Sequence, residues 1–295
     1  MNKIKSIVKF IIPQCWWPEI SFFRHLLLSR DAKNLKKIKF LKTREDVIVL
    51  GNGPSLKNDM EKVVKNSNNY DFVCVNNFCT SPYYETIKPS KYIFLDDYFF
   101  SENAHPDWIK QRESTFKTIN EKTHWAMQVF LPPSANDRIL KKFIKNTNVE
   151  IIKIKVVGYD NLIFKKIVQR FDTGYFGPYQ GNVLIYAVYL SIWAKHKRIK
   201  IFGADLSFHK DIEVNQKNNN VDIRFRHFNR EDHVERLMKN PEKIHPFSMS
   251  EIMQTTADSF RAHELLNHYA IEKNVEIENC SSFSFIDAYI RNELV

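Results

Sequence analysis

The sequence is poor in glycine and cysteine, and these shortages exclude several classes of protein. Only 7 of its 295 residues are Gly while 43% are hydrophobic, so the chain is neither collagen-like, nor of low complexity, nor wholly disordered. Its four cysteines (Cys15, Cys74, Cys79 and Cys280) form no C-x-x-C pair and no zinc-ligand spacing. They are too few for a disulfide framework, which indicates a reducing compartment.

Long apolar runs are missing as well. No stretch reaches the roughly 18 apolar residues of a membrane-spanning helix, so none is expected. Residues 1–13 carry three lysines and a short apolar run, but lack the apolar length and the small-residue cleavage site of a signal peptide. We therefore expect a cytoplasmic protein, either free or bound to a membrane.

The net charge of +10 is unevenly distributed. Residues 1–46 hold 11 Lys/Arg and 4 Asp/Glu, whereas residues 47–295 hold 33 and 30. In the basic arm, residues 1–45, cations alternate with bulky apolar residues that include Trp16 and Trp17. Indoles at headgroup depth beside cations suit an anionic membrane surface, the predicted partner, although the apolar residues would alternatively pack on the domain. No nucleic-acid partner is expected, because the nearly neutral remainder carries no recognisable binding motif.

Residues 46–295 alternate between strand-like and helix-like segments. Apolar, β-branched runs lie at 46–50, 71–76, 91–95, 125–130, 149–157, 199–202 and 275–277, and helix-like stretches lie near 56–66, 106–120, 136–147, 160–170, 182–196, 252–273 and 284–292. Such alternation predicts an α/β domain, Rossmann-like, with a mostly parallel sheet covered by helices on both faces. Ligands of these sheets bind beyond the carboxyl ends of the strands.

One segment, at about 206–250, interrupts the alternation and predicts a lid or small subdomain. His227, His233 and His245 lie inside it and His209 at its entrance; one of them is a candidate general base. The alternative for each is a plain surface histidine. Three neighbouring arginines that would clamp a phosphate or carboxylate are Arg224, Arg226 and Arg230. The histidine spacing matches no standard zinc site.

A glycine-containing loop, Gly51-Asn52-Gly53-Pro54-Ser55, follows the first strand and opens a helix. Glycine lets the backbone turn tightly and approach a ligand, and Ser55 is a natural N-cap at an anion-binding helix terminus. The loop is neither a G-x-G-x-x-G fingerprint nor a Walker loop. It predicts contact with a nucleotide phosphate or ribose, the alternative being an ordinary strand-to-helix turn.

Polar residues also follow the second and third strands. The amides of Asn76 and Asn77 suit a base edge or a sugar hydroxyl, or simply form a turn. The carboxylates of Asp96 and Asp97 would suit a divalent cation, or Asp97 would cap the next helix; no metal is included in the predicted site.

Two further elements point to the same edge of the sheet. Gln180-Gly181-Asn182 precedes a long apolar helix, and the following strand leads into Gly203-Ala204-Asp205. The carboxylate of Asp205 would hold a ribose hydroxyl or orient a lid residue, or alternatively cap a turn.

Together these residues resemble the bacterial sialyltransferases of glycosyltransferase family 42. The resemblance rests on Val-Ile-Val-Leu-Gly-Asn-Gly-Pro-Ser-Leu at 47–56, the Asn77-Phe78 strand end, the Gly203-Ala-Asp205 element and the tail around Cys280-Ser-Ser282 with Ile-Asp-Ala-Tyr-Ile, and it covers 46–292. The Gly-Asn-Gly-Pro-Ser loop is shared with flagellin-modifying glycosyltransferases and archaeal-type pterin pyrophosphokinases.

The resemblance implies an inverting glycosyltransferase with a GT-A-like variant of the Rossmann-like fold. Such an enzyme transfers sialic acid or a related nonulosonic acid from a CMP-activated donor to a glycan or glycolipid acceptor of surface polysaccharide or lipooligosaccharide. It needs no metal or other cofactor, and it works at the inner face of the bacterial inner membrane.

The resemblance also assigns roles to particular residues. Asn52 and Ser55 would lie against the phosphate and sugar of the donor, Asn76 near the cytidine or sialyl side, and Ser281 and Ser282 near the cytidine or phosphate. The general base would be a lid histidine, His245 first and His227 second.

The sequence departs from the family pattern at three positions where the sugar and phosphate of the donor would bind. Gln180-Gly181-Asn182 replaces a Thr-Ser-Gly triplet, Asp96-Asp97 replaces Asn-Pro-Ser, and no tyrosine follows Gly203-Ala-Asp205. Another nucleotide sugar, an ATP-dependent pyrophosphokinase-like reaction on the same loop, and a non-catalytic binding protein are therefore the alternatives. The sequence also leaves homo-oligomer formation open.

Overall fold

The computed structural model describes residues 20, 31–159, 163–228 and 230–292. Most of the basic arm, including Trp16 and Trp17, lies outside these residues, and so does the membrane expectation drawn from it. In the described part of the chain, no helix is both long enough and apolar enough to cross a bilayer.

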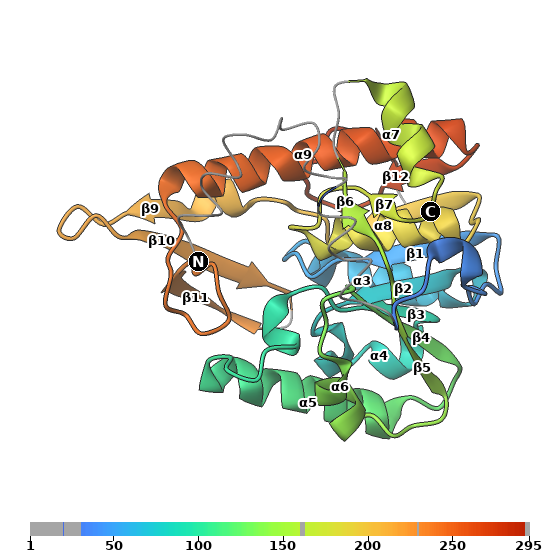
Figure 1. Ribbon diagram of the computed structural model, residues 1–295, viewed down its shortest axis with the longest axis horizontal. Helices are drawn as coiled ribbons and strands as arrows, with labels where there is room; N and C mark the ends of the chain where they lie inside the picture. The colour runs from blue at the N-terminus through green and yellow to red at the C-terminus, as the bar shows by residue number, and fades with distance from the viewer. Residues whose placement is uncertain (1–19, 21–30, 160–162, 229, 293–295) are drawn as a thin grey trace.

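The centre of the molecule is an eight-stranded sheet in the order β13-β12-β8-β1-β2-β3-β4-β5 (Figure 1). Its strands are β1 (Asp46–Leu50), β2 (Asp71–Val75), β3 (Lys91–Ile93), β4 (Met127–Leu131), β5 (Val149–Lys153), β8 (Arg198–Phe202), β12 (Glu276–Asn279) and β13 (Ile290–Arg291). All neighbouring pairs run parallel. Every residue of β2 is buried, as expected for a parallel sheet covered on both faces. The predicted fold class is confirmed.

Helices cover the two faces of this sheet in separate groups. Along β1, Val47 and Val49 belong to one apolar cluster and Ile48 and Leu50 to the other, because successive side chains of a strand point to opposite faces. The first cluster includes residues of α7 (Phe164–Phe171), α8 (Val183–Trp193) and α9 (Met249–Glu272). The second includes residues of α3 (Leu56–Lys65), α4 (Tyr84–Ile87), α5 (Pro106–Lys122) and α6 (Asp137–Phe143).

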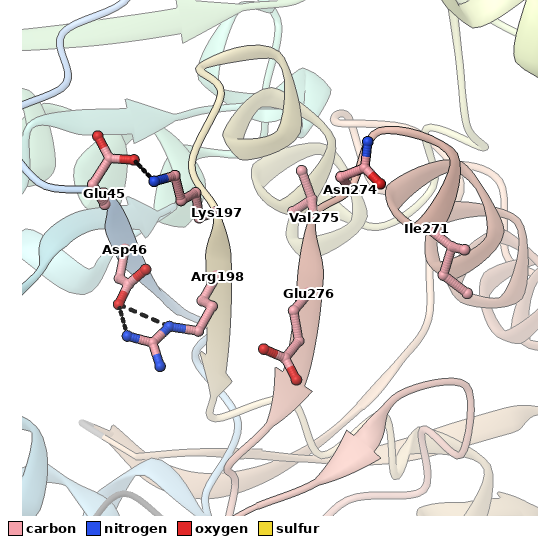
Figure 2. Close-up of a pocket in the computed structure, with 8 residues that line it drawn as sticks. All are labelled: Glu45, Asp46, Lys197, Arg198, Ile271, Asn274, Val275 and Glu276. Carbon is pink, nitrogen blue, oxygen red and sulfur yellow. Dashed lines mark hydrogen bonds and ion pairs between the residues drawn. The ribbon is translucent and has the colours of Figure 1, made fainter.

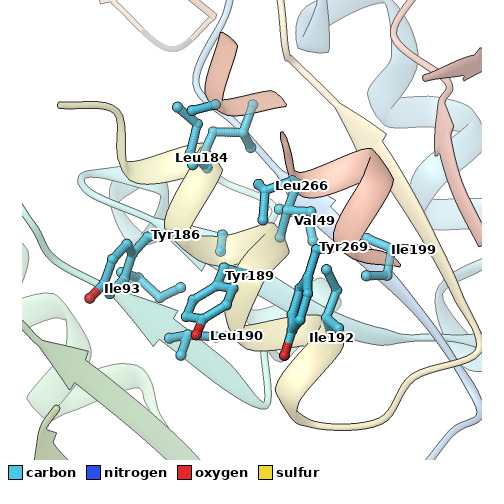
Figure 3. Close-up of a cluster of buried hydrophobic side chains, with 14 of the residues drawn as sticks. Val49, Ile93, Leu184, Tyr186, Tyr189, Leu190, Ile192, Ile199, Leu266 and Tyr269 are labelled. Atoms are coloured by element: carbon cyan, nitrogen blue, oxygen red, sulfur yellow. The ribbon is translucent and has the colours of Figure 1, made fainter. Parts of the chain in front are cut away.

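Helix α8 is apolar around its whole circumference because it lies between the sheet and α9 (Figure 3). Tyr189 is fully buried there, and its hydroxyl donates to the carbonyl of Phe176 at 2.7 Å, so the buried polar atom has a partner. Val49 and Ile199 of the sheet and Tyr269 of α9 gather around the same helix. This packing fixes the position of the residues that precede α8.

The segment predicted to be a lid or subdomain contains a three-stranded antiparallel sheet: β9 (Ile212–Val214), β10 (Val221–His227) and β11 (Arg230–Arg236). In Figure 1 it stands apart from the central sheet, beside the start of α9. We call β9–β11 and residues 237–247 the roof. In β10 the buried Val221 and Ile223 alternate with the more exposed Asp222 and Arg224, as in a strand with one covered face.

The prediction of a helix at 284–292 is wrong. Residues 281–289 form a loop that leads into the short strand β13. The Ser284 hydroxyl donates to the carbonyl of Ala204, and the Asn279 amide donates to Ser284 and to the carbonyl of Ile286. Side-chain bonds of this kind satisfy backbone groups that a helix would otherwise pair, and so they compete with it.

Candidate functional site

A cleft of about 900 Å³ lies at the carboxyl ends of β1, β2, β3 and β8, under the roof. Its walls also include the residues before and at the start of α8, the first turns of α5 and part of α9. This is the edge at which parallel α/β sheets bind their ligands. Of the predicted site residues, the cleft brings together Gly51, Asn52, Gly53, Asn76, Asn77, Gln180, Gly181, Asn182 and Asp205.

The loop after β1 is held by Asp205 at the end of β8. Ser55 donates to this carboxylate from its backbone N–H at 3.1 Å and from its hydroxyl at 2.6 Å. The hydroxyl does not cap α3, so the predicted side-chain N-cap is wrong: Asp205 is a stronger acceptor than a backbone group. Burial raises the pKa of Asp205, and the bonds from Ser55 oppose that rise. Both residues are buried, and the hydrogen bonds from Ser55 to Asp205 fix the conformation of the loop after β1.

Replacing Ser55 by Ala should lower the free energy of unfolding by about 1.5–3 kcal/mol, because a buried carboxylate loses a charge-assisted donor. Urea unfolding measures this change. Ser134→Ala is the control, since Ser134 is exposed on the cleft wall, and it should change stability by less than about 0.5 kcal/mol. Equal stability of the two variants would contradict the role given to the Ser55–Asp205 bond.

Asn52 and Asn76 stand at the ends of adjacent strands, and both have an unpaired oxygen. The Asn52 amide donates to the carbonyl of Val75 at 3.3 Å, and the Asn76 amide donates to the Asp96 carboxylate at 3.0 Å. Both Oδ1 atoms are covered by protein atoms and have no hydrogen-bond partner. Asn76 also has φ +48°, in the left-handed region that non-glycine residues rarely adopt. Covered polar atoms without partners and rarely adopted backbone conformations are both features that cluster at functional sites.

Asp96 and Asp97 follow β3 on the cleft floor. Asp96 is exposed in the cleft, and desolvation by the surrounding cleft walls raises its pKa to about 6; Asn76 opposes the rise and Asp97 adds to it. Burial, and then Glu242, raise the pKa of Asp97. Carboxyls that tend to hold their protons are poor cation ligands, and the described residues contain no group of three His, Cys, Asp or Glu that could hold a metal ion.

Asn77 has a structural position within the site. It is buried, its amide donates to the Tyr98 hydroxyl at 3.0 Å, and its oxygen accepts from Thr115 of α5 at 2.7 Å. Arg112 of α5 donates to the carbonyls of Tyr98 and Ser101, so the loop after β3 is fastened to α5. Asn77 therefore positions Tyr98 in the cleft wall.

The residues before α8 supply the opposite wall. Asn182 caps α8 by accepting from the N–H of Leu184 at 2.9 Å, and the Gln180 amide donates to the carbonyl of Val156 at 2.9 Å. A Cβ at Gly181 would come within 2.2 Å of the Tyr179 hydroxyl, so the ring lies directly over the glycine. Gln180 and Asn182 both line the cleft, and these two hydrogen bonds tie their side chains to the neighbouring backbone.

Ser281 and Ser282 lie behind the loop and do not line the cleft. The Ser281 hydroxyl accepts from the N–H of Ala204 at 3.1 Å, and Ser282 donates from its N–H to Asp59 of α3 at 2.9 Å. The Ser282 hydroxyl also donates to the carbonyl of Ser55 at 3.4 Å. The two serines therefore brace the loops that follow β1 and β8.

Of the roof histidines, the structure places His233 in the cleft wall. Its ring stacks on Phe225, and its Nε2 lies 3.7 Å from the Glu235 carboxylate. His245 is exposed and outside the lining, although residues on either side of it line the cleft. His227 ends β10, but its side chain lies outside the described part of the chain. The apolar–polar alternation of residues 221–226 is the signal that would have placed His227 at the end of a strand.

Five cations of the roof line the cleft: Arg224, Arg226, Arg236, Lys239 and Lys243. Lys243 pairs with Glu235 at 2.9 Å and lies 4.8 Å above the ring of Trp108 on α5. Roof and floor also meet where the N–H of His105 donates to the carbonyl of Pro241 at 2.8 Å. The cleft therefore has a basic roof above a floor that carries Asp96 and Asp97.

A second hollow, of about 710 Å³, lies at the opposite edge of the sheet (Figure 2). Four of its charged groups form ion pairs: Arg198 with Asp46, and Lys197 with Glu45 at 3.2 Å. It is open to solvent and contains none of the predicted site residues. The functional site is therefore assigned to the cleft under the roof.

A polar cleft at the carboxyl edge of a parallel sheet, with a glycine-containing loop after the first strand, is the architecture of a ligand-binding α/β enzyme. The chain belongs to the MptE-like family, described as 6-hydroxymethylpterin diphosphokinase MptE-like, which matches residues 22–211. The match agrees with the likeness of the Gly51–Ser55 loop to that of pterin pyrophosphokinases, one of the families that share it. No curated protein matches the chain significantly.

The fold is similar to that of the MAf glycosyltransferase from Magnetospirillum magneticum AMB-1, with a TM-score of 0.50 and 11% sequence identity. The similarity covers 92% of this chain and 38% of that one. At this identity it supports the fold alone. Neither comparison names a sialyltransferase, so the sialyl donor enters below as a proposal.

Proposed function

We propose that the chain is a glycosyltransferase that takes its sugar from a nucleotide-activated donor. The observation that supports this most is the cleft itself, which combines the Gly51–Gly53 loop, a basic roof and His233. Following the sialyltransferase resemblance, the proposed donor is a CMP-activated sialic acid or related nonulosonic acid. The proposed acceptor is a glycan of surface polysaccharide or lipooligosaccharide, and the reaction inverts the anomeric centre without a metal.

In this mechanism the acceptor hydroxyl attacks the anomeric carbon as the bond to the leaving phosphate breaks. The leaving group gains negative charge, which the roof cations would stabilise. A roof histidine would take the acceptor proton. The roof would also exclude water, which otherwise hydrolyses the donor.

His233 is the roof histidine that the geometry favours as the base, with Glu235 orienting its ring. His233→Gln should lower transfer about 100-fold or more, the range of a lost general base, with little effect on nucleotide affinity. His245→Gln and His227→Gln test the two bases implied by the resemblance in the same assay. Full activity of His233→Gln, with loss in either of the others, would transfer the role to that histidine.

The proposed function as a whole is tested by a ligand panel. CMP, CDP, UDP, GDP and ATP, each with and without magnesium, are compared by thermal shift, since a ligand that binds only the folded state raises the midpoint. We expect the largest shift with CMP, unaffected by EDTA. CMP-activated donors are then assayed for transfer to lipooligosaccharide. Stabilisation by none of the cytidine nucleotides would contradict the proposed donor.

Membership of the MptE-like family favours a second candidate, transfer of diphosphate from ATP to a pterin. Magnesium would then arrive as a complex with ATP, the usual route where the protein supplies few carboxylates. This reaction predicts ATP-dependent consumption of 6-hydroxymethylpterin that EDTA abolishes. Activity that survives EDTA would exclude it.

We also propose that the basic arm, residues 1–45, binds an anionic membrane surface and holds the enzyme at the inner face of the bacterial inner membrane. The excess of cations there and the pair Trp16 and Trp17 support this. A chain lacking residues 1–42 should no longer sediment with anionic vesicles but should still bind nucleotide. Continued sedimentation would mean that the arm is not the anchor.

A further inference from the structure

One corner of the cleft, at the carboxyl ends of β1, β2 and β3, has three unusual features in residues that lie close together. The Oδ1 atoms of Asn52 and Asn76 are unpaired acceptors, and Asn76 has a left-handed backbone. The third is that Asp96, bonded to Asn76, is a carboxyl that binds its proton unusually well. Covered acceptors without donors cost free energy, so their retention at a cleft wall points to a ligand that supplies the donors.

The orientation of the two amides follows from their partners. Asn52 donates to a carbonyl, which cannot donate in return, so its NH2 and oxygen cannot be exchanged. Asn76 donates to Oδ2 of Asp96. The corner therefore offers a fixed acceptor, the Asn52 oxygen, and a second acceptor, the Asn76 oxygen, while Asp96 is ionised. The carboxyl itself either accepts or, when protonated, donates.

We infer that Asn52, Asn76 and Asp96 form a subsite that reads the amino edge of a heteroaromatic ring, meaning an exocyclic –NH2 group beside a ring nitrogen. Because both amide oxygens are covered by protein atoms in this conformation, the amides turn toward the cleft to accept from the –NH2 group, and the carboxyl meets the ring nitrogen. Cytosine and a 2-amino-4-oxopterin both present such an edge, whereas uracil and a lumazine carry an oxygen in place of the amine. The inference rests on the proposed function for the presence of such a ring in the cleft, and it assigns a role to Asp96.

The state of the Asp96 carboxyl decides which ring nitrogen it can bind. The ring nitrogen of cytosine beside the amine is an acceptor, so it requires the protonated carboxyl, and binding strengthens as the pH falls through about 6. The amine of a pterin lies between a nitrogen that carries a hydrogen and a nitrogen that accepts; the first requires the ionised carboxyl, with binding that strengthens as the pH rises through about 6, and the second requires the protonated carboxyl.

Other charged groups face this corner. Asp97 lies on the same loop, Asp107 on α5, and Glu242 and Lys243 on the roof. Toward β8, Asp205 is occupied by Ser55. Of these charged groups, Asp97 raises the pKa of Asp96. Asp97→Asn is therefore the matched control, because it removes the same charge from the same loop without touching Asn76.

The test measures dissociation constants of the full chain by calorimetry between pH 5 and 8, without added metal. CMP is paired with UMP, and 6-hydroxymethylpterin with 6-hydroxymethyllumazine, so that the ratio within a pair cancels titration of the phosphate. We expect the amino member of one pair to bind at least about 10-fold more tightly than its oxo partner. The pair that shows this preference identifies the ring class, and the pH trend of its ratio identifies the state of the carboxyl that binds it.

The variants decide whether Asp96 carries the effect. Asp96→Asn should abolish the pH dependence of the ratio, while Asp97→Asn should keep it with a midpoint at lower pH, since the Asp97 charge no longer raises the pKa of Asp96. Ratios within about twofold for both pairs, or a pH dependence that survives in Asp96→Asn, would overturn the inference. If the chain transfers a sugar but shows no such preference, the proposed function stands and the subsite is wrong. If it shows the preference but transfers no sugar, the subsite stands and the proposed function is wrong.

Discussion

Gly53→Ala is expected to abolish most of the activity, because the loop has no room for a methyl group. A Cβ at this position would lie 2.0 Å from Oδ2 of Asp205 and 2.7 Å from the carbonyl oxygen of Gly203. Both neighbours are fixed, Asp205 by Ser55 and Gly203 by its backbone bond from Gly53 at 3.0 Å. The loop must move, and we expect a loss of about 1–3 kcal/mol of stability. A displacement of about 1 Å at the reacting groups also suffices for a roughly 100-fold slower transfer.

The matched control is Gly158→Ala in β6 (Val157–Gly158), where a Cβ would meet nothing nearer than the Pro178 carbonyl at 3.6 Å. Both variants are compared by urea unfolding and by nucleotide titration. Gly158→Ala should resemble the unaltered chain in both assays. If Gly53→Ala bound nucleotide as tightly as Gly158→Ala, the loop would not be part of the nucleotide site.

Acid should destabilise the protein from pH 6.5 downward, because two buried histidines are neutral in the folded state. His263 is fully buried, with Nδ1 2.8 Å from the Tyr289 hydroxyl, and burial lowers its pKa to about 3. Burial, and then the nearby Lys91 cation, lower the pKa of His196 to about 4, while Asp71 opposes this. The unfolded chain therefore binds more protons between about pH 4 and 6.5, so stability rises with pH in this window. Each histidine contributes roughly 3 kcal/mol across it.

Asp96 acts in the opposite direction, since its pKa of about 6 in the folded state lies above the ordinary 3.8, and its contribution is lost as the pH rises toward 6. The histidine effect is isolated by comparing variants. His263→Gln keeps a polar group near Tyr289 but does not titrate, so the slope of unfolding free energy against pH should become shallower. His124 is exposed, and His124→Gln should leave the slope unchanged. Identical slopes for His263→Gln and the unaltered chain would contradict the assignment.

Much of the fold could be predicted because its signals are local. Helix α5 begins at Pro106, one residue after a capping His105, and the predicted 106–120 agrees closely with the observed Pro106–Lys122. The loop after β1 was recognised from five consecutive residues, and the cleft was expected at the edge where it is found. These features depend on residues adjacent in the sequence and on the general geometry of parallel sheets.

The missed features depend on contacts across long separations. The hydroxyl of Ser55 bonds to Asp205, 150 positions away, so its local suitability as a cap was misleading. The helix predicted at 284–292 is replaced by bonds between this tail and the loop after β8. The roof strands carry an alternation in residues 221–226 that is visible in the sequence, but the surrounding polar residues obscured it. Both His233 and His245 are exposed, and the fact that His233 lines the cleft while His245 does not cannot be inferred without the fold.

Helix α9 connects the cleft under the roof with the apolar core beside α8. Its 24 residues run from the cleft, where Ile252, Thr255 and Ser259 form part of the wall, to the core, where Leu266 and Tyr269 pack beside α8. If the roof tilted and moved the first turns of α9 with it, the packing of Leu266 and Tyr269 at the other end of the helix would oppose the movement. The apolar contacts of α9 outside the cleft therefore help to hold the cleft wall in place, and substitutions among them would displace the wall without changing a residue that lines it.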